Sequence, residues 1–338
     1  MIANIQRRRY SVIWLPTLPA EGNNSQFQIY LQPGQKIRAE KFTLENLAWL
    51  GRGGNGTVFR MIVVSGDLRG LIVAVKFLQS LEDAERVARF NQEIQILERV
   101  NHPHVIKVLD KGEFKDRDRQ IPFFVMEYQP GNFEREFEAH PRGFDPDSVL
   151  PLCLQMASAL VHLHRKNIVH HDLKPSKVLF DGNNVKIADW GIARLVERSG
   201  LRSIVTPDGE KLAPHFYISP EQWKWWRKET TDHPDKPSDI FQFGLIIYQM
   251  MTGSNPNTVH QWAEAEGEGA QQRVPSEKIR NWEESLFNDV GGIVREMVDV
   301  DSDARPAADW VQDRLLVLFR AYTSHFTALY GARPGREF

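Results

Sequence analysis

The pattern of hydrophobic and polar residues divides most of the chain into a strand-rich part followed by a helix-rich part. Between residues 42 and 128, short runs of β-branched and aromatic residues such as TVFRMIVV and LIVAVKFL alternate with turn residues. One segment of this part, residues 81–100, instead has apolar residues at helical spacing. From about residue 133 onward helical spacing dominates, interrupted near residues 168–190 by two short strand-like runs. The pattern predicts an α+β fold, with a small β-rich part that contains one main helix and a larger helical part.

Residues 1–42 precede this pattern and are interpreted as an N-terminal extension. Two strand-like runs, SVIWL and FQIYL, are separated by PAEGNNS, which has the composition of a turn. The two runs could form a hairpin that packs on the following domain, or an arm that binds a partner. We favour packing on the domain.

Length, charge and cysteine content restrict the class of protein. A chain of 338 residues can form one large domain or two lobes, each with its own core. The formal net charge of −2 gives no general electrostatic reason to expect a nucleic acid or an anionic membrane as partner. Cys153 is the only cysteine, which excludes an internal disulfide and a cysteine-built zinc site. No stretch approaches the ~20 apolar residues of a membrane-spanning helix. Together with the net charge, this leads us to expect a cytoplasmic protein that binds neither nucleic acid nor membranes.

A glycine-rich segment, LGRGGNGTVF, lies between two strand-like stretches and contains Gly51, Gly53 and Gly56. Glycines let the backbone approach phosphate oxygens and present N–H donors to them. A dinucleotide site would need a helix directly after the last glycine, but the residues that follow, TVF, are β-formers. The segment therefore predicts a loop that covers a nucleotide between two antiparallel strands, with a merely flexible hairpin as the alternative.

A lysine and a glutamate in the β-rich part form a predicted ion pair. Alternation in the strand LIVAVKFL puts Ala74 and Lys76 on one face, where the small Ala74 leaves room for an adenine ring. Glu93 lies on the apolar side of the helix predicted at residues 81–100, and a carboxylate buried there needs a cationic partner. Lys76 is the candidate, and the pair would orient this lysine on the α- and β-phosphates. From the strand alone, a lysine that extends to water is an equal alternative.

The segment IVHHDLKPSKVLFDGNNVKIADWG predicts two convergent carboxylates. Its runs VLF and VKIAD flank the turn DGNN and are interpreted as a short antiparallel hairpin. Asp172 precedes the first strand and Asp189 ends the second, so the two side chains meet at one end of the hairpin. One carboxylate could accept or position the proton of a substrate hydroxyl, and the other could bind Mg²⁺.

These motifs, in this order, resemble the Hanks-type (eukaryotic-like) serine/threonine protein kinases. The resemblance covers about residues 43–318 and implies a bilobal protein-kinase-like fold. The β-rich N-lobe would comprise residues 43–128 and the helical C-lobe residues 129–318, followed by a C-terminal tail at residues 319–338.

The resemblance also implies roles for single residues. Asp172 would be the catalytic aspartate, Lys174 would contact the transferring phosphate, and Lys76 would complete the catalytic set. Asp189 would hold Mg²⁺, with Mn²⁺ as the alternative ion. The nucleotide ATP would contact the glycine loop, the gatekeeper, the hinge and neighbouring strands. The residues expected there are Gly51, Gly53, Gly56, Val58, Ala74, Lys76, Glu93, Met126 (the gatekeeper), Glu127, Tyr128 and Gln129 (the hinge), and Leu179.

Motifs later in the chain fit the same family. Glu221, in the sequence SPE, occupies the position at which the family ends its activation segment with Ala-Pro-Glu. Asp239 lies near the start of DIFQFGLIIYQMM, which is apolar on most sides and is expected to be a buried helix. Arg305, in the sequence DARP, is placed like the arginine that pairs with the equivalent of Glu221.

Three departures from the family pattern concern the same region. Lys177 occupies the position of an asparagine that binds a second Mg²⁺, and an ammonium has no lone pair with which to ligate a metal. His171 replaces the arginine that usually contacts a phosphorylated activation loop. Ala213 or Pro214 stands where a threonine is usual. Either one metal is bound, or the Lys177 cation supplies charge at the second-metal position.

The function predicted from the sequence is ATP-dependent transfer of the γ-phosphoryl group to serine or threonine hydroxyls of a protein substrate. The main alternative is an ATP-binding pseudokinase that acts as a regulatory or signalling module. A third hypothesis, a small-molecule phosphotransferase, is disfavoured because the SPE segment, Asp239 and Arg305 resemble a platform for protein substrates.

Overall fold

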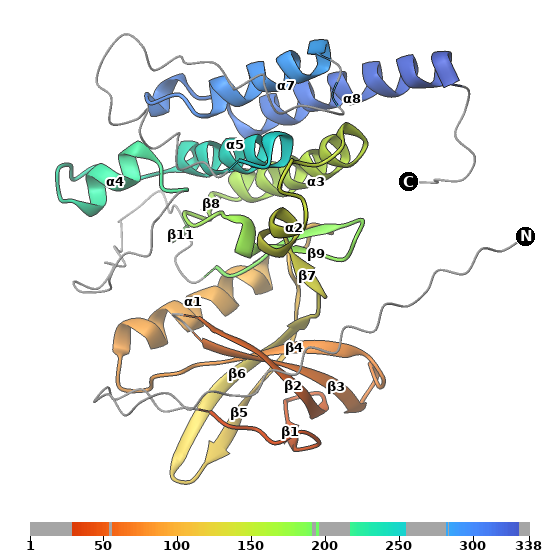
Figure 1. The fold of residues 1–338 in the computed structure, drawn as a ribbon. Coiled ribbons are helices and arrows are strands. Elements are labelled where there is room, and N and C mark those ends of the chain that lie inside the picture. The colour runs from red at the N-terminus through yellow and green to blue at the C-terminus, as the bar shows by residue number, and fades with distance from the viewer. Residues whose placement is uncertain are drawn as a thin grey trace, which may run out of the picture.

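In a computed structural model, the chain forms a sheet lobe and a helical lobe that are stacked on each other (Figure 1). The structure describes residues 29–53, 56–190, 194–195, 217–254, 282 and 284–330. The run SVIWL and the positions Ala213 and Pro214 lie outside the described residues. The predicted α+β class and the bilobal arrangement are confirmed. Within the described part of the chain, no helix is both long enough and apolar enough to cross a membrane.

The sheet lobe contains one six-stranded antiparallel sheet in the order β1-β2-β3-β4-β6-β5. The strands are β1 (Lys36–Arg38), β2 (Thr43–Gly53), β3 (Gly56–Ser65), β4 (Ile72–Phe77), β5 (Val108–Asp116) and β6 (Arg119–Glu127). Alternate residues of β3 are buried, as the pleat requires when one face covers a core. Aliphatic side chains and phenylalanine rings form that core, and the ring centroids of Phe77 and Phe123 lie 5.1 Å apart.

Helix α1 (Ala84–Arg99) packs against this sheet (Figure 1). Its buried residue Phe90 lies 5.3 Å from the ring of Phe124 on β6. The helix begins three residues later than predicted because Asp83 caps it, accepting hydrogen bonds from the backbone N–H groups of Glu85 and Arg86.

Residues before β2 also belong to the sheet lobe. Strand β1 pairs with β2, and Ile29, Leu31 and Ile37 are buried in the same core as the strands. The side-chain amide of Asn46 donates hydrogen bonds to the carbonyl oxygens of Leu31 (2.9 Å) and Gln32 (3.1 Å). The described part of the N-terminal segment is therefore bound to the sheet by backbone pairing, apolar burial and a buried amide.

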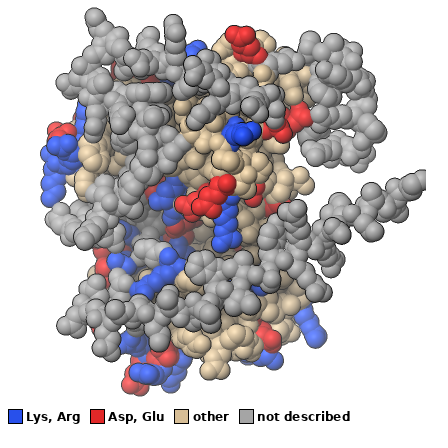
Figure 2. All heavy atoms as spheres, in the orientation of Figure 1, with Lys and Arg blue, Asp and Glu red and all other residues tan. Residues whose placement is uncertain are grey.

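The helical lobe contains α2 (Phe133–Ala139), α3 (Pro146–Arg165), α4 (Pro220–Trp226), α5 (Lys236–Thr252), α7 (Glu284–Met297) and α8 (Ala308–Tyr330). Short elements lie where this lobe faces the sheet: β7 (Gly131–Asn132), β8 (Ile168–Val169), η1 (Pro175–Lys177), β9 (Val178–Phe180), β10 (Val185–Ile187) and β11 (Arg194–Leu195). The 3₁₀ turn η3 (Ser302–Ala304) precedes α8. On the face shown in Figure 2, the described cationic and anionic side chains are intermixed.

Helix α5 is the centre of this lobe. It is buried along nearly its whole length, which agrees with its apolar sequence. Gly253 ends it in the left-handed conformation (φ 67°), and a Cβ at this position would lie 2.4 Å from the carbonyl oxygen of Pro141. Helix α8 continues past residue 318, and the Tyr322 hydroxyl donates to Asp147 of α3 (2.7 Å). The sequence-based boundary between domain and tail thus falls inside a helix, because the apolar face of α8 extends beyond it.

Candidate active site

Lys76 and Glu93 form a buried ion pair between the sheet and α1. The Lys76 Nζ donates to both carboxylate oxygens of Glu93, at 2.8 and 2.7 Å. Their side chains are only 7% and 1% exposed, so this pair is screened little by solvent. The same Nζ lies 2.9 Å from Oδ1 of Asp189. The pairing expected from strand and helix periodicity is present, and it connects β4 to the segment after β10.

The β9–β10 hairpin brings the two aspartates together as expected. Val178 pairs with Ile187, and the Ala188 N–H donates to the carbonyl oxygen of Lys177 at 2.9 Å. The Lys177 Nζ contacts Oδ2 of Asp189 and lies 3.7 Å from Oδ2 of Asp172. One lysine therefore bridges the two carboxylates.

A second lysine also lies beside Asp172. The Lys174 Nζ lies 3.1 Å from Oδ1 of Asp172. Burial by itself raises the pKa of Asp172, but the Lys177 and Lys174 cations hold that pKa below its ordinary value. Asp172 is therefore a carboxylate at neutral pH. Burial lowers the pKa of Lys177 to about 8, although Asp172 favours its charged form. Lys177 is still predominantly cationic near pH 7.

The backbone before Asp172 is held by a carboxylate of α5. Asp239 is fully buried and accepts hydrogen bonds from the N–H groups of His170 (2.9 Å) and His171 (2.8 Å). Its Oδ2 also lies 2.9 Å from Nε2 of His164. Burial raises the pKa of Asp239, but the His164 hydrogen bond and nearby histidines bring it below its ordinary value. These contacts support His171 in the left-handed conformation (φ 64°), which costs a non-glycine residue roughly 1–2 kcal/mol.

The expected nucleotide-binding residues lie on adjacent strands and at the lobe junction. Gly51 and Gly53 are on β2, Gly56 and Val58 on β3, Ala74 and Lys76 on β4, Glu93 on α1, Met126 and Glu127 on β6, Tyr128 and Gln129 directly after β6, and Leu179 on β9. Strand register sets Val58 opposite Lys76 and Ala74 opposite Met126. Val58, Ala74 and Met126 therefore lie in the same region of the sheet as Lys76.

Gly56 fills a position that a larger residue cannot occupy without movement. A Cβ there would lie 2.7 Å from the carbonyl oxygen of Phe77 and 3.0 Å from Cγ of Lys76. The close approach of β3 to β4 beside Lys76 thus depends on glycine. Gly51 differs, since a Cβ at that position would meet nothing within 4 Å.

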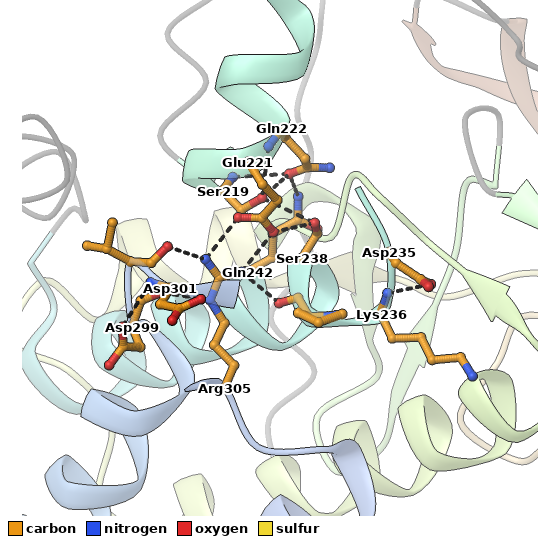
Figure 3. A network of polar contacts seen from close by, with 12 residues as sticks. Ser219, Glu221, Gln222, Asp235, Lys236, Ser238, Gln242, Asp299, Asp301 and Arg305 are labelled. Atoms are coloured by element: carbon orange, nitrogen blue, oxygen red, sulfur yellow. Dashed lines mark hydrogen bonds and ion pairs between the residues drawn. The ribbon is translucent and has the colours of Figure 1, made fainter. Parts of the chain in front are cut away.

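Glu221 and Arg305 form the ion pair expected from the SPE and DARP motifs (Figure 3). Two guanidinium nitrogens of Arg305 donate to the two carboxylate oxygens of Glu221, at 2.8 and 2.9 Å. Burial raises the pKa of Glu221, but the Arg305 hydrogen bonds and charge hold it below its ordinary value. The pair fixes α4 to the segment before α8.

Two glutamines near Asp172 were missed by sequence reasoning. Gln222 on α4 and Gln242 on α5 are buried, and both amides donate to the carbonyl oxygen of His171. The available signal was a glutamine inside an otherwise apolar helix, DIFQFGLIIYQMM, since a buried amide needs partners.

Comparison with known proteins gives results of two kinds. A family model described as "Protein kinase domain" matches residues 44–316. A probable serine/threonine-protein kinase of Streptomyces coelicolor is 35% identical over 211 residues, covering 61% of this chain and 30% of that relative. The serine/threonine-protein kinase pkn3 of Myxococcus xanthus is 33% identical over 228 residues, covering 65% and 39%. PknB of Mycobacterium tuberculosis is 33% identical over 214 residues, covering 62% and 32%. The chain thus spans about a third of the length of these relatives.

Proposed function

Because this chain belongs to the protein kinase domain family, we propose that it is an ATP-dependent serine/threonine protein kinase acting on a protein substrate. The observation that carries the proposal is the convergence of Asp172, Lys174, Lys76 and Asp189, with the Lys76–Glu93 pair formed. Its relatives' names, which describe serine/threonine-protein kinases, support the same activity. We also propose a cytoplasmic location, on the sequence grounds given above.

In the proposed reaction, a substrate hydroxyl oxygen forms a bond to the γ-phosphorus of ATP. The bond from that phosphorus to the β–γ bridging oxygen breaks, and ADP leaves. Asp172, a carboxylate at neutral pH, positions the hydroxyl and accepts its proton. Lys174, beside Asp172, would offset charge on the transferring group, and Lys76, oriented by Glu93, would hold the remaining phosphates.

The residues present fit one divalent metal ion. Mg²⁺ is commonly held by one or two carboxylates together with phosphate oxygens, and the Asp189 side chain is 31% exposed beside Lys76. A Mg²⁺ held by Asp189, or Mn²⁺ in its place, would neutralise phosphate charge during transfer. Lys177 adds an ammonium between Asp172 and Asp189 and can donate no lone pair. The arrangement supports a one-metal site in which Lys177 supplies the other positive charge.

The bridging position of Lys177 also favours a second candidate, a nucleotide-binding pseudokinase without phosphoryl transfer. Incubation with labelled ATP distinguishes the two, using the protein itself and a generic basic protein as acceptors, in Mg²⁺ and in Mn²⁺. Asp172→Ala serves as the blank. Phosphoserine or phosphothreonine above the blank is the result expected of a kinase. ATP binding without transfer in either ion would replace the kinase proposal with the pseudokinase.

A further inference from the structure

A buried amide of α5 contacts the backbone on both sides of Asp172. The N–H of Leu173 donates to Oε1 of Gln242 at 2.7 Å, and Nε2 of Gln242 donates to the carbonyl oxygen of His171 at 3.0 Å. Gln242 is 2% exposed, so both hydrogen bonds are made away from water. A single side chain thus fixes the peptide groups that precede and follow the proposed catalytic carboxylate.

Gln242 acts together with Asp239 on the same helix face. The two residues are three positions apart on α5, which puts both side chains on one side of the helix. Asp239 accepts hydrogen bonds from the N–H groups of His170 and His171, and Gln242 accepts one from the N–H group of Leu173. The backbone of residues 170–173 is therefore bound to α5 through successive peptide groups.

Gln222 extends this contact to α4. Its Nε2 donates to the His171 carbonyl oxygen at 2.7 Å, and its Oε1 accepts from Nε2 of Gln242 at 2.9 Å. The same Oε1 accepts from the backbone N–H of Ser219 at 3.0 Å, within the capping box that begins α4. Figure 3 shows Gln222 and Gln242 lying between the start of α4 and α5, beside Ser219 and Ser238.

The carbonyl oxygen of His171 is the point at which the two amides meet. It accepts from both Gln222 and Gln242, while Gln242 also donates to Gln222. Loss of either side chain leaves buried partners without a hydrogen bond, so the effects of the two losses are coupled. Through Gln222, the start of α4 is therefore connected by hydrogen bonds to the peptide group directly before Asp172.

We propose that Gln222 and Gln242 are positioning residues for Asp172, which make its placement depend on the placement of α4. This inference rests on the proposed function, because it concerns the residue assigned to accept the substrate proton. The hydrogen bonds of the two glutamines described above go to the backbone beside Asp172 and to the start of α4, not to Lys76, Glu93 or Asp189. Nucleotide binding is therefore expected to be independent of them.

The variants Gln222→Met and Gln242→Met test the proposal, since methionine has a side chain of similar length but lacks the amide C=O and NH₂ groups. Gln249→Met is the matched control on α5, because Gln249 accepts from the Tyr217 hydroxyl and not from residues 170–173. Each test variant is expected to lower kcat roughly 10- to 100-fold with KM for ATP unchanged, as a small misplacement of a catalytic group does. The effects of the two substitutions should not be additive in the double variant, because both glutamines donate to the His171 carbonyl oxygen and Gln242 also donates to Gln222.

Hydrogen exchange of the folded full chain supplies a readout that needs no activity. Faster exchange at residues 170–174 is expected in Gln242→Met and in Gln222→Met but not in Gln249→Met. Unchanged exchange there, or unchanged kcat in a folded Gln242→Met protein, would overturn the proposal. A rise in KM for ATP with unchanged kcat would also overturn it. If the parent protein transfers no phosphate, the kinase proposal fails, while the exchange result still decides whether the glutamines position Asp172.

Discussion

The Lys177 ammonium lies between Asp172 and Asp189, in contact with Oδ2 of Asp189 and 3.7 Å from Oδ2 of Asp172. The sequence left two interpretations of this lysine: either one metal is bound, or the Lys177 cation supplies charge at the second-metal position. Its position favours the supply of charge, because it brings a cation to both carboxylates of the candidate active site. The two carboxylates would otherwise repel each other or attract a further metal ion.

Lys177→Asn is therefore expected to change the metal dependence of phosphoryl transfer. Removing the cation leaves carboxylate charge that a second divalent ion must then neutralise. Half-maximal activity should therefore require a higher Mg²⁺ concentration, or the Mg²⁺/Mn²⁺ preference should change. Titration of activity with each ion measures this. Lys111→Asn is the control, because Lys111 forms an exposed pair with Glu98. Identical metal titrations for the parent and Lys177→Asn would contradict the assigned role.

Lys76→Met is expected to remove phosphoryl transfer and to destabilise the protein. The variant leaves the Glu93 carboxylate, which is 1% exposed, without its ammonium partner, and breaking a buried pair typically costs about 3–5 kcal/mol. The double variant Lys76→Met/Glu93→Leu removes both charges and should recover most of the free energy of unfolding. Its phosphoryl transfer should stay at the level of the Asp172→Ala blank. Denaturant titration and labelled-ATP transfer separate the two effects, and recovery of activity in the double variant would show that Lys76 is only structural.

Gly56→Ala should be more damaging than Gly51→Ala. The added methyl at residue 56 would meet the Phe77 carbonyl oxygen at 2.7 Å, whereas that at residue 51 meets nothing within 4 Å. Overpacking of this kind costs about 1–3 kcal/mol, and it would also move β3 away from Lys76. The denaturation midpoint and ATP affinity of both variants measure the difference. Equal denaturation midpoints for the two variants would show that β3 and β4 can move apart at residue 56 without loss of stability.

The Glu221–Arg305 pair should make stability fall in acid. The pKa of Glu221 in the folded chain is below its ordinary value, so the pair stabilises the fold above the ordinary pKa of about 4.3. That contribution is lost as the pH falls through the folded-state pKa, because the unfolded chain then binds the proton more readily. Glu221→Gln should show a smaller decrease in unfolding free energy between pH 6 and pH 3. The same decrease in both proteins would contradict this assignment.

Local sequence rules predicted those parts of the site in which one face of an element is buried. Strand alternation placed Lys76, helical periodicity placed Glu93, and the turn DGNN placed Asp172 near Asp189. The hydrogen bond from Leu173 to Gln242 was not predicted, because it joins residues 69 positions apart. Nothing in the spacing of DIFQF indicates which backbone N–H group donates to the Gln242 side chain. The bridging contact of Lys177 was likewise absent from the prediction, because it depends on the register of β9 with β10.

The pairing of β1 with β2 has a consequence for any shortened form of this protein. A chain that begins at residue 44, where the family match starts, would lack the neighbouring strand of β2 and the buried side chains of Ile29, Leu31 and Ile37. The edge of β2 would then offer unpaired N–H and C=O groups beside uncovered apolar surface, which is a template for association between molecules. A well-behaved shortened form of this chain should therefore keep residues 29–43, upstream of the homologous region.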